Sequence, residues 1–447
     1  MFRRAALSLV ATGWIAFALP AGAAPAPAAK PQPRATIVYV VKKGDTLFDL
    51  ASHFLLSADA ARTVQRLNHI ADPRRMPVGL RLNIPLRLVR QEPIRARIHS
   101  FSGAVTITAA GRTAAAAPGT AVGEGSDIQT GANAFVSLEL PDGTIVTMPS
   151  QTRVRIAMLR STPLTGSVDR RFDVSTGKIR AVVVPMTDPR STFRVGTPVA
   201  VSAVRGTEFR VGYDPALNRA VTEVLTGTVA VAGPQAPDVL VHAGFGAAAG
   251  SGAEAGAVPR PLLPAPVPTV PIDTQREATL PFAVAPVAGA AAYRLQIARD
   301  AGFLDQVGEA DSVAPNFVLQ SLPDGTYFVR ISALDATGIE GRSEVYGFQR
   351  RLHNVATSMD RRTEGDRRDY LFRWQSQGAG TYAYRFQLAR CGDERRPVVD
   401  QDNVAGFSLT VTDLPKGAYC WRVQSVEVGD DPGDVIWSDT KTFTIAR

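Results

Sequence analysis

Cysteine and histidine are scarce in this sequence, and their scarcity limits the chemistry of which the chain is capable. Two cysteines and five histidines occur in 447 residues, and the histidines show no spacing typical of a metal site. The sequence has no His-Glu-x-x-His or Gly-x-Ser-x-Gly motif and no Cys-His pair typical of a nucleophile and its base. We therefore expect no bound metal, no cofactor and no enzymatic activity.

Long apolar runs are absent after the first two dozen residues. Arg3 and Arg4 precede an apolar stretch over residues 5–19, and small residues follow at 21–23. The stretch is shorter than the about 20 residues that span a bilayer, and its flanks are typical of a secretory signal peptide. We predict a cleaved signal peptide over 1–23, a mature chain without a transmembrane anchor, and a location in the periplasm or elsewhere in the cell envelope.

A large excess of charge of one sign is also lacking. Removal of the signal peptide leaves 47 basic against 41 acidic residues, a net charge of +6 that is spread along the chain. This excess favours contact with anionic envelope polymers, but it forms no basic groove interleaved with aromatic residues. We expect no nucleic-acid partner.

Glycine, proline and short Val-rich runs are plentiful, and together they predict a mainly β, turn-rich, multidomain chain. Shifts in composition mark the linkers between the domains. The predicted divisions are an Ala/Pro linker at 24–36, a small domain at 37–86, a β-rich domain at 95–245, a Gly/Ala/Pro-rich linker at 246–275, and two β-sandwich modules at 276–350 and 351–447.

The last part of the chain contains an internal repeat. Residues 293–299 (YRLQIAR) recur as 384–390 (YRFQLAR), and residues 322–330 (LPDGTYFVR) recur as 414–422 (LPKGAYCWR). Both pairs are offset by nearly the same number of residues, so two homologous modules follow one another. Their strand spacing and Leu-Pro-x-Gly turn resemble fibronectin type III and related immunoglobulin-like sandwiches, which implies that they space or present other domains.

Aromatic residues of the two modules are predicted to pack in their cores, with an aromatic platform for sugars as the alternative. The core candidates are Phe282, Val284, Tyr327, Phe372, Trp374 and Tyr419. Both cysteines, Cys391 and Cys420, fall within the second module. Because an exported location permits disulfides, we predict a structural bridge between them that stabilises the module by roughly 2–4 kcal/mol.

Residues 37–86 show the pattern of a small β-α-α-β domain. Thr46 is expected to cap the first helix, and Asp49 completes a capping box with it. Ser57 is expected to cap a second helix, which ends at Asn68. Apolar residues at helical spacing predict one buried core. Its helical members are Leu47, Leu50, Ala51, Phe54, Ala60, Val64 and Leu67.

This small domain resembles the lysin-motif (LysM) family. The matching residues are Tyr39-Val-Val41, Gly44-Asp-Thr-Leu47, Leu50-Ala51, Leu67-Asn68 and Gly79-Leu-Arg-Leu-Asn-Ile-Pro85. The resemblance implies binding of N-acetylglucosamine-containing glycans, chiefly peptidoglycan, in a groove between the loop before the first helix and the loop before the last strand. The candidate glycan-binding residues are Gly44, Asp45, Thr46, Leu47, Ile70, Ala71, Asp72, Met76, Pro77 and Gly79.

Such a groove suits the chemistry of N-acetyl sugars. Their amide groups can bond to the backbone of the two loops, and their apolar face can contact aliphatic side chains such as Leu47 and Met76. Each contact is modest, so one motif is expected to bind weakly and to depend on a long polymer for avidity.

Residues 95–245 resemble a FecR-type domain. The matching segments are Gly103–Ile107, Gly125–Gly131, Leu140–Thr144, Thr176–Lys178, Phe193–Thr197, Arg205–Val211 and Glu223–Val229. Signalling members of that family relay the state of an outer-membrane transporter and need a cytoplasmic segment and a transmembrane helix, which a cleavable signal peptide does not supply. The resemblance therefore implies a periplasmic β-domain for contact with proteins or ligands.

Three functional hypotheses follow from this organisation. The one we predict is a non-catalytic cell-envelope protein that binds peptidoglycan and presents its β-modules as a scaffold to envelope protein partners. The second is a periplasmic signal-transduction or regulatory component that acts through the FecR-like domain. The third is an accessory protein or activator of a peptidoglycan hydrolase.

Overall fold

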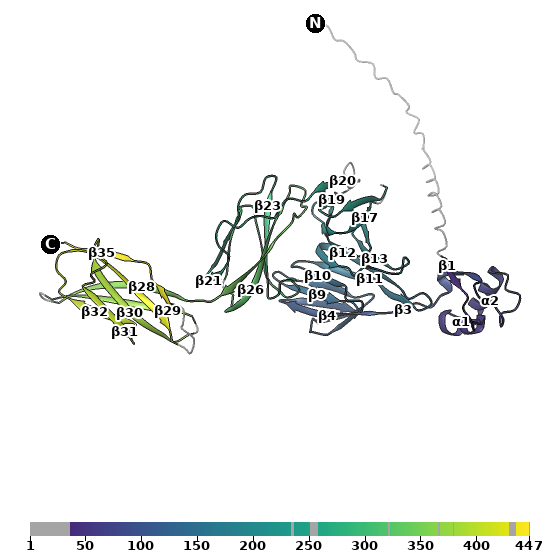
Figure 1. Cartoon of the computed structure of the whole chain (residues 1–447), viewed down its shortest axis with the longest axis horizontal. Helices are drawn as coiled ribbons and strands as arrows, with labels where there is room; N and C mark the ends of the chain where they lie inside the picture. The colour runs from purple at the N-terminus through teal and green to yellow at the C-terminus, as the bar shows by residue number, and fades with distance from the viewer. Residues whose placement is uncertain are drawn as a thin grey trace, which may run out of the picture. The chain divides into compact units, whose positions relative to one another are not determined.

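A computed structural model describes residues 36–233, 237–250, 258–320, 322–364, 367–378, 380–428 and 435–446. These residues are mainly β, with two short α-helices near the start of the described chain (Figure 1), which confirms the predicted fold class. The predicted signal peptide at 1–23 and all but the last residue of the linker at 24–36 lie outside the described residues. No helix in the described part is long and apolar enough to cross a membrane.

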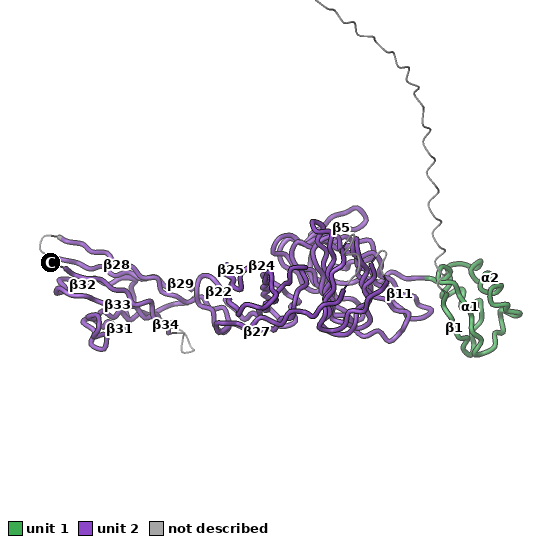
Figure 2. Tube along the Cα trace, turned by 90° about the horizontal axis from the view of Figure 1, so that it is seen from above, with its two compact units in different colours: residues 1–90 green, residues 91–447 purple. Residues whose placement is uncertain are grey.

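The chain divides into two compact units, residues 1–90 and residues 91–447 (Figure 2). The first contains the N-terminal domain, which we define as residues 36–90. The second contains the middle domain (92–261), the first C-terminal module (274–350) and the second C-terminal module (354–445).

The N-terminal domain has the predicted β-α-α-β order. Its elements are β1 (Thr36–Val40), α1 (Leu47–Phe54), α2 (Ala58–Leu67), β2 (Arg81–Pro85) and the 3₁₀ helix η1 (Leu86–Leu88). β1 and β2 pair antiparallel, with Ile37 opposite Ile84. Both isoleucines are buried, so the two-stranded sheet turns one face into the core.

Side-chain caps fix where the two helices begin, as predicted. The Asp49 N–H donates to Thr46 Oγ1 at 3.0 Å, and the Ala60 N–H donates to Ser57 Oγ at 3.2 Å. The Thr46 hydroxyl in turn donates to the Asp49 carboxylate at 2.6 Å, so this carboxylate bonds the cap side chain and not a backbone N–H. The prediction for Leu67 is wrong, because it is the last residue of α2 and stays 49% exposed.

The described residues of the middle domain form strands and no helix. Backbone hydrogen bonds pair these strands, each with its neighbours, into one continuous closed sheet around a single hydrophobic core. The strands are β3 (Glu92–Pro93), β4 (Arg95–Ser102), β5 (Val105–Ala109), β6 (Arg112–Ala115), β7 (Ala121–Gly123), β8 (Asp127–Thr130), β9 (Phe135–Glu139), β10 (Ile145–Met148), β11 (Arg153–Thr162), β12 (Ser167–Val182), β13 (Thr192–Gly196), β14 (Val201–Val204), β15 (Glu208–Asp214), β16 (Arg219–Thr226), β17 (Thr228–Ala232), β18 (Val239–His242), β19 (Phe245–Ala249) and β20 (Val258–Pro261). The long strand β12 pairs with different strands along its length: residues 167–176 pair with β11, and residues 177–182 pair with β15.

The segment expected as a linker at 246–275 is in part ordered sheet. β19 pairs with β16 on one side and with β20 on the other. Ala247 and Ala249 are buried in the core, and a Cβ on Gly246 would lie 2.6 Å from Ile339. Small residues, which are typical of linkers, here let a strand pack closely, and for this reason composition misplaces the domain boundary.

The two C-terminal modules are sandwiches of two sheets each. The strands of the first are β21 (Thr274–Gln275), β22 (Leu280–Ala283), β23 (Ala292–Ala298), β24 (Gln306–Ser312), β25 (Asn316–Leu319), β26 (Gly325–Leu334) and β27 (Val345–Arg350). Those of the second are β28 (Asn354–Glu364), β29 (Arg367–Gln377), β30 (Tyr382–Arg390), β31 (Val399–Val404), β32 (Ser408–Thr412), β33 (Gly417–Glu427), β34 (Val435–Trp437) and β35 (Lys441–Ile445). In the first, β22 and β25 pack against the sheet of β21, β27, β26, β23 and β24; in the second, β28, β29 and β32 pack against the sheet around β30 and β33.

The predicted core aromatics are buried in both modules, which favours packing over a sugar platform. They are Phe282 and Tyr327 in the first module and Phe372, Trp374 and Tyr419 in the second; Val284, the counterpart of Trp374, is buried as well. The repeated tyrosine also makes a repeated bond: Tyr327 Oη donates to Pro323 O at 3.0 Å, and Tyr419 Oη donates to Pro415 O at 2.7 Å. Each bond is a tyrosine corner that ties a strand to the turn before it.

Cys391 and Cys420 form a disulfide in the second module, as predicted, with their Cα atoms 5.1 Å apart. Cys391 directly follows β30, and Cys420 lies on β33, its neighbour in the sheet. The bridge therefore joins two adjacent strands of one sheet.

Candidate functional site

The two loops expected to form a glycan groove lie side by side in the N-terminal domain. The Leu47 N–H, at the start of α1, donates to Pro73 O in the loop between α2 and β2, at 2.8 Å. That loop also returns to the end of the first strand, where the Gly79 N–H donates to Val41 O at 2.8 Å. The fold thus brings together the two sets of candidate residues.

Residues of the first loop hold it in shape. The Asp45 carboxylate accepts hydrogen bonds from the Tyr39 hydroxyl and the Lys42 N–H, both at 2.7 Å. Burial of the Tyr39 hydroxyl, together with its bond to Asp45, raises the pKa of Tyr39 to about 12. Thr46 caps α1, and Gly44 has a φ of +93°, which favours glycine. Substitution of these loop residues would therefore change folding as well as any binding.

Several of the candidate glycan contacts belong to the core. Leu47 is 3% exposed, Met76 8% and Ile70 9%. Burial leaves Leu47 and Met76 little surface to offer to the apolar face of a sugar, so they support the loops from inside. The exposed members of the candidate set are Gly44, Ala71, Asp72, Pro77 and Gly79.

A groove that the sequence did not indicate runs beside these loops. It has a volume of about 530 Å³ and is lined by α1, α2, the loop after α2 and the end of the domain. Its apolar surface includes Phe48 and Leu56, which are 76% and 61% exposed. The sequence signal for Phe48 is an aromatic residue that falls outside the buried stripe of an amphipathic helix.

Asn68, at the end of the Leu-Asn motif, ties α2 to β2. Its Nδ2 donates to Val64 O at 2.8 Å and to Asn83 O at 2.9 Å. Its Oδ1 accepts from the Asn83 N–H at 2.6 Å. Because Asn68 does not line the groove, it supports the site by positioning the loop that begins after it.

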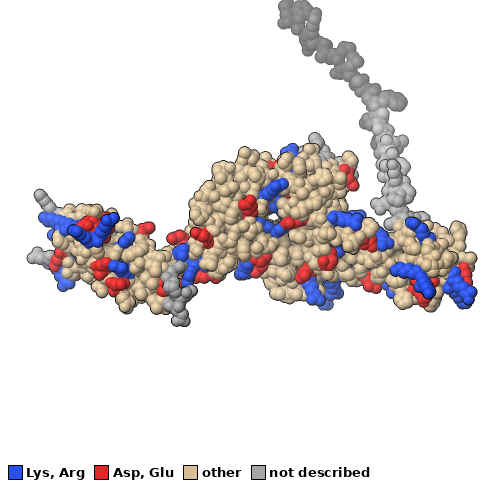
Figure 3. Space-filling model, viewed as in Figure 1, with Lys and Arg blue, Asp and Glu red and all other residues tan. Residues whose placement is uncertain are grey.

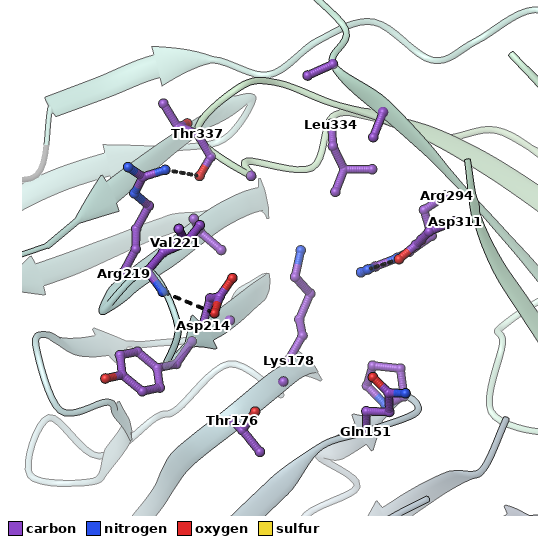
Figure 4. Close-up of a pocket in the computed structure, with 18 of the residues that line it drawn as sticks. Gln151, Thr176, Lys178, Asp214, Arg219, Val221, Arg294, Asp311, Leu334 and Thr337 are labelled. Carbon is purple, nitrogen blue, oxygen red and sulfur yellow. Dashed lines mark hydrogen bonds and ion pairs between the residues drawn. The ribbon is translucent and has the colours of Figure 1, made fainter. Parts of the chain in front are cut away.

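A second pocket lies in the other unit, between the middle domain and the first C-terminal module (Figure 4). Its volume is about 640 Å³. Lys178 and Arg219 line it from the middle domain, and Arg294 and Asp311 line it from the module. Cationic and anionic side chains are mixed around this pocket, so its charge does not favour a ligand of one sign.

Buried charges beside this pocket join the two domains. Glu340, in the turn after β26, accepts from Arg210 Nη1 at 2.8 Å and from Lys178 Nζ at 2.9 Å. Lys178 Nζ also contacts the Glu223 carboxylate at 3.1 Å, and the same carboxylate accepts from the Glu340 N–H at 3.0 Å. Removal of one member of such a buried network leaves an uncompensated charge, which is costly. The network therefore holds the module against the middle domain.

Two carboxylates at this junction, Glu340 in the network and Glu309 beside Arg294, differ in their electrostatic surroundings. Burial alone would raise the pKa of Glu340, but Arg210, Lys178 and Arg294 hold it well below its ordinary value. Burial raises the pKa of Glu309, against the opposing effect of Arg294. Within the part of the chain that the structure describes, no three His, Cys, Asp or Glu side chains are grouped to hold a metal ion.

Comparison with known families identifies two segments of the chain. The LysM domain model matches residues 39–85, from β1 to β2, and the FecR protein model matches residues 126–230, inside the middle domain. Both are families of binding or signalling domains typical of cell-envelope proteins. The first match supports glycan binding, and the second supports a regulatory role in the envelope. The comparison with curated proteins found no match.

Solved structures show only a weak overall likeness. A provisionally assigned anti-sigma factor from Parabacteroides distasonis is 20% identical with a TM-score of 0.26, and the match covers 30% of this chain and 59% of that chain. A segment of two fibronectin type III domains from chicken tenascin is 16% identical with a TM-score of 0.20, covering 40% of this chain and 99% of that chain. The chain is therefore similar to the LysM family over residues 39–85 and to the FecR family over residues 126–230.

Proposed function

We propose that the chain is an exported, non-catalytic cell-envelope protein that binds peptidoglycan through its LysM domain and presents its other domains to envelope proteins. The observation that carries the proposal is the LysM match over residues 39–85. It falls on a domain whose two candidate loops are joined by the bond between Leu47 and Pro73. The signal peptide predicted at 1–23 supports export.

The groove beside these loops suits a glycan. The exposed ring of Phe48 offers a flat apolar surface to the C–H face of a sugar. Backbone groups of the two loops offer hydrogen bonds to acetamido groups. One groove of this size binds a few sugars weakly, so retention on the cell wall depends on the repetition of the same sugars along the polymer.

The second unit supports the role as a scaffold. The buried network around Glu340 joins the middle domain to the first C-terminal module, so the two domains present adjoining surfaces to a partner. A disulfide between Cys391 and Cys420 cross-links the second module.

The proposal is tested by cosedimentation of the chain from residue 24 onwards with purified peptidoglycan sacculi. The comparison is the same chain without residues 36–90, which are the described residues of the first compact unit. We expect only the chain with the LysM domain to pellet. If neither form pellets, or both pellet equally, the LysM domain is not the anchor.

The regulatory alternative has its own support in the FecR match. A regulator that relays a signal into the cell must stay attached to the membrane, so its N-terminal segment must remain uncleaved. The scaffold has no such requirement. N-terminal sequencing of the protein from fractionated cells separates the two. A mature N-terminus near residue 24 in the soluble envelope fraction supports the scaffold, and an intact N-terminus in the membrane fraction supports the regulator.

A further inference from the structure

The groove of the N-terminal domain is lined by cations and by no acidic residue. Among its lining residues, Arg62, Arg74 and Arg90 carry charge. They come from α2, from the loop after it and from the end of the domain, so the fold gathers them from three separate segments. All three are exposed. Figure 3 shows Lys and Arg side chains on the visible face of this domain.

The acidic residues of the domain bond to groups close to them in the sequence, among them exposed Arg62. The domain contains nine Lys or Arg residues against four Asp. Asp45, Asp49 and Asp72 accept hydrogen bonds within their own loops or helix start. Asp59 lies 2.8 Å from Arg62, but both side chains are largely exposed, and such a pair is weak. The domain therefore keeps an excess of positive charge, and none of its carboxylates lines the groove.

We propose that this groove selects glycans that carry carboxylates, with Arg74 and Arg90 contacting the free carboxylates of the stem peptides of peptidoglycan. The inference rests on the proposed function and names its substrate class. Peptidoglycan carries short peptides with free carboxylates along its strands, whereas chitin oligomers contain the same N-acetylglucosamine without charge. Guanidinium groups bind carboxylates through two parallel hydrogen bonds, so they distinguish these polymers where Phe48 does not.

Two double variants of the chain from residue 24 onwards test this role. R74Q/R90Q removes two charges from the groove. R66Q/R81Q removes two exposed charges of the same domain that do not line it. Because all four side chains are exposed, neither variant is expected to unfold the domain, and circular dichroism and thermal unfolding check this.

Binding is measured to intact sacculi by cosedimentation, and in solution to the peptide-free glycan strands that an amidase releases from sacculi and to chitin oligomers. We expect R74Q/R90Q to bind intact sacculi about five-fold more weakly, as two exposed ion pairs imply, and to bind chitin oligomers as the parent does. R66Q/R81Q is expected to match the parent on every ligand. Raised salt should narrow the difference between the parent and R74Q/R90Q.

The outcomes separate this inference from the proposed function. If the parent pellets with sacculi and R74Q/R90Q pellets equally well, the arginines have no such role while peptidoglycan binding stands. An unchanged affinity of the parent after amidase treatment overturns the assignment to stem peptides. If the parent binds none of the three ligands, the proposed function fails and this inference fails with it.

Discussion

Arg210 Nη1 lies 2.8 Å from Glu340 Oε1, and this buried ion pair joins the middle domain to the first C-terminal module. Arg210 Nη2 also donates to the backbone carbonyls of Glu340 and Gly341, at 2.6 and 2.8 Å. One guanidinium thus holds both the side chain and the backbone of the turn that contains Glu340. The two residues lie on separate domains, so this contact helps to hold the domains together.

We predict that Glu340→Ala loosens this junction. The substitution removes one of the two carboxylates beside the buried Arg210 and Lys178 and leaves Glu223 alone to compensate both cations, which costs up to about 3–5 kcal/mol. Hydrogen exchange over β15 and β26 measures the loss as a lower free energy of local opening. The control is Glu344→Ala, which removes an exposed carboxylate of the same module and should change exchange little. Equal protection in the two variants would contradict a structural role for Glu340.

The same junction should resist mild acid. The cations around Glu340 depress its pKa in the folded chain, so its contribution to stability is fully present above the ordinary carboxyl pKa of about 4.3. That contribution is lost only as the pH falls through the depressed pKa of the folded state. Hydrogen exchange at pH 7, 5 and 3, corrected for intrinsic rates, should show the junction closed at the first two values. Opening between pH 7 and pH 5 would show that another group controls it.

The disulfide between Cys391 and Cys420 should stabilise the second C-terminal module alone. Its removal by Cys391→Ser with Cys420→Ser is expected to lower the free energy of unfolding of that module by roughly 2–4 kcal/mol. Apart from Trp14 in the predicted signal peptide, every tryptophan of the chain lies in this module, so tryptophan fluorescence during urea unfolding follows it selectively. Thiol labelling of the unreduced, denatured parent checks the bridge, since two free thiols there would refute it.

The two tyrosine corners offer a matched pair of substitutions. Tyr419→Phe removes the bond to Pro415 and should cost the second module about 0.5–1.5 kcal/mol. Tyr327→Phe removes the equivalent bond to Pro323 in the first module. Because the tryptophans report on the second module, only Tyr419→Phe is expected to shift the fluorescence transition. A shift of equal size with Tyr327→Phe would mean that the modules unfold together.

Local patterns in the sequence predicted the elements that depend on near neighbours. The caps at Thr46 and Ser57 depend on residues three positions away, and the repeat aligns Tyr327 with Tyr419 without any knowledge of the fold. The LysM resemblance also predicted which two loops meet, because that family pattern contains the long-range pairing.

The sequence could not predict features that depend on which residues the tertiary fold buries. Arg210 and Glu340 are 130 positions apart, and charged residues are usually exposed, so nothing marks them as a buried pair. Exposure of Phe48 beside buried Leu47 depends on which face of α1 the rest of the domain covers. The alanines of β19 resemble a linker in composition, although the core buries Ala247 and Ala249.

The neighbours Leu47 and Phe48 should separate folding from glycan binding. Leu47 is buried, and its replacement by Ala is expected to cost about 2–5 kcal/mol of stability, which weakens binding only by unfolding the domain. Phe48 is 76% exposed on the groove, so Phe48→Ala should leave the unfolding temperature unchanged.

Loss of the ring contact in Phe48→Ala should weaken binding to sacculi by about five-fold, which corresponds to roughly 1 kcal/mol of apolar contact. Thermal unfolding of both variants, set beside their cosedimentation with sacculi, distinguishes the two effects. A Phe48→Ala variant that is stable and binds like the parent would move the glycan site away from this groove. The exposed candidate loop residues, Asp72 and Pro77 among them, would then be the place to look, because their side chains reach solvent and do not line this groove.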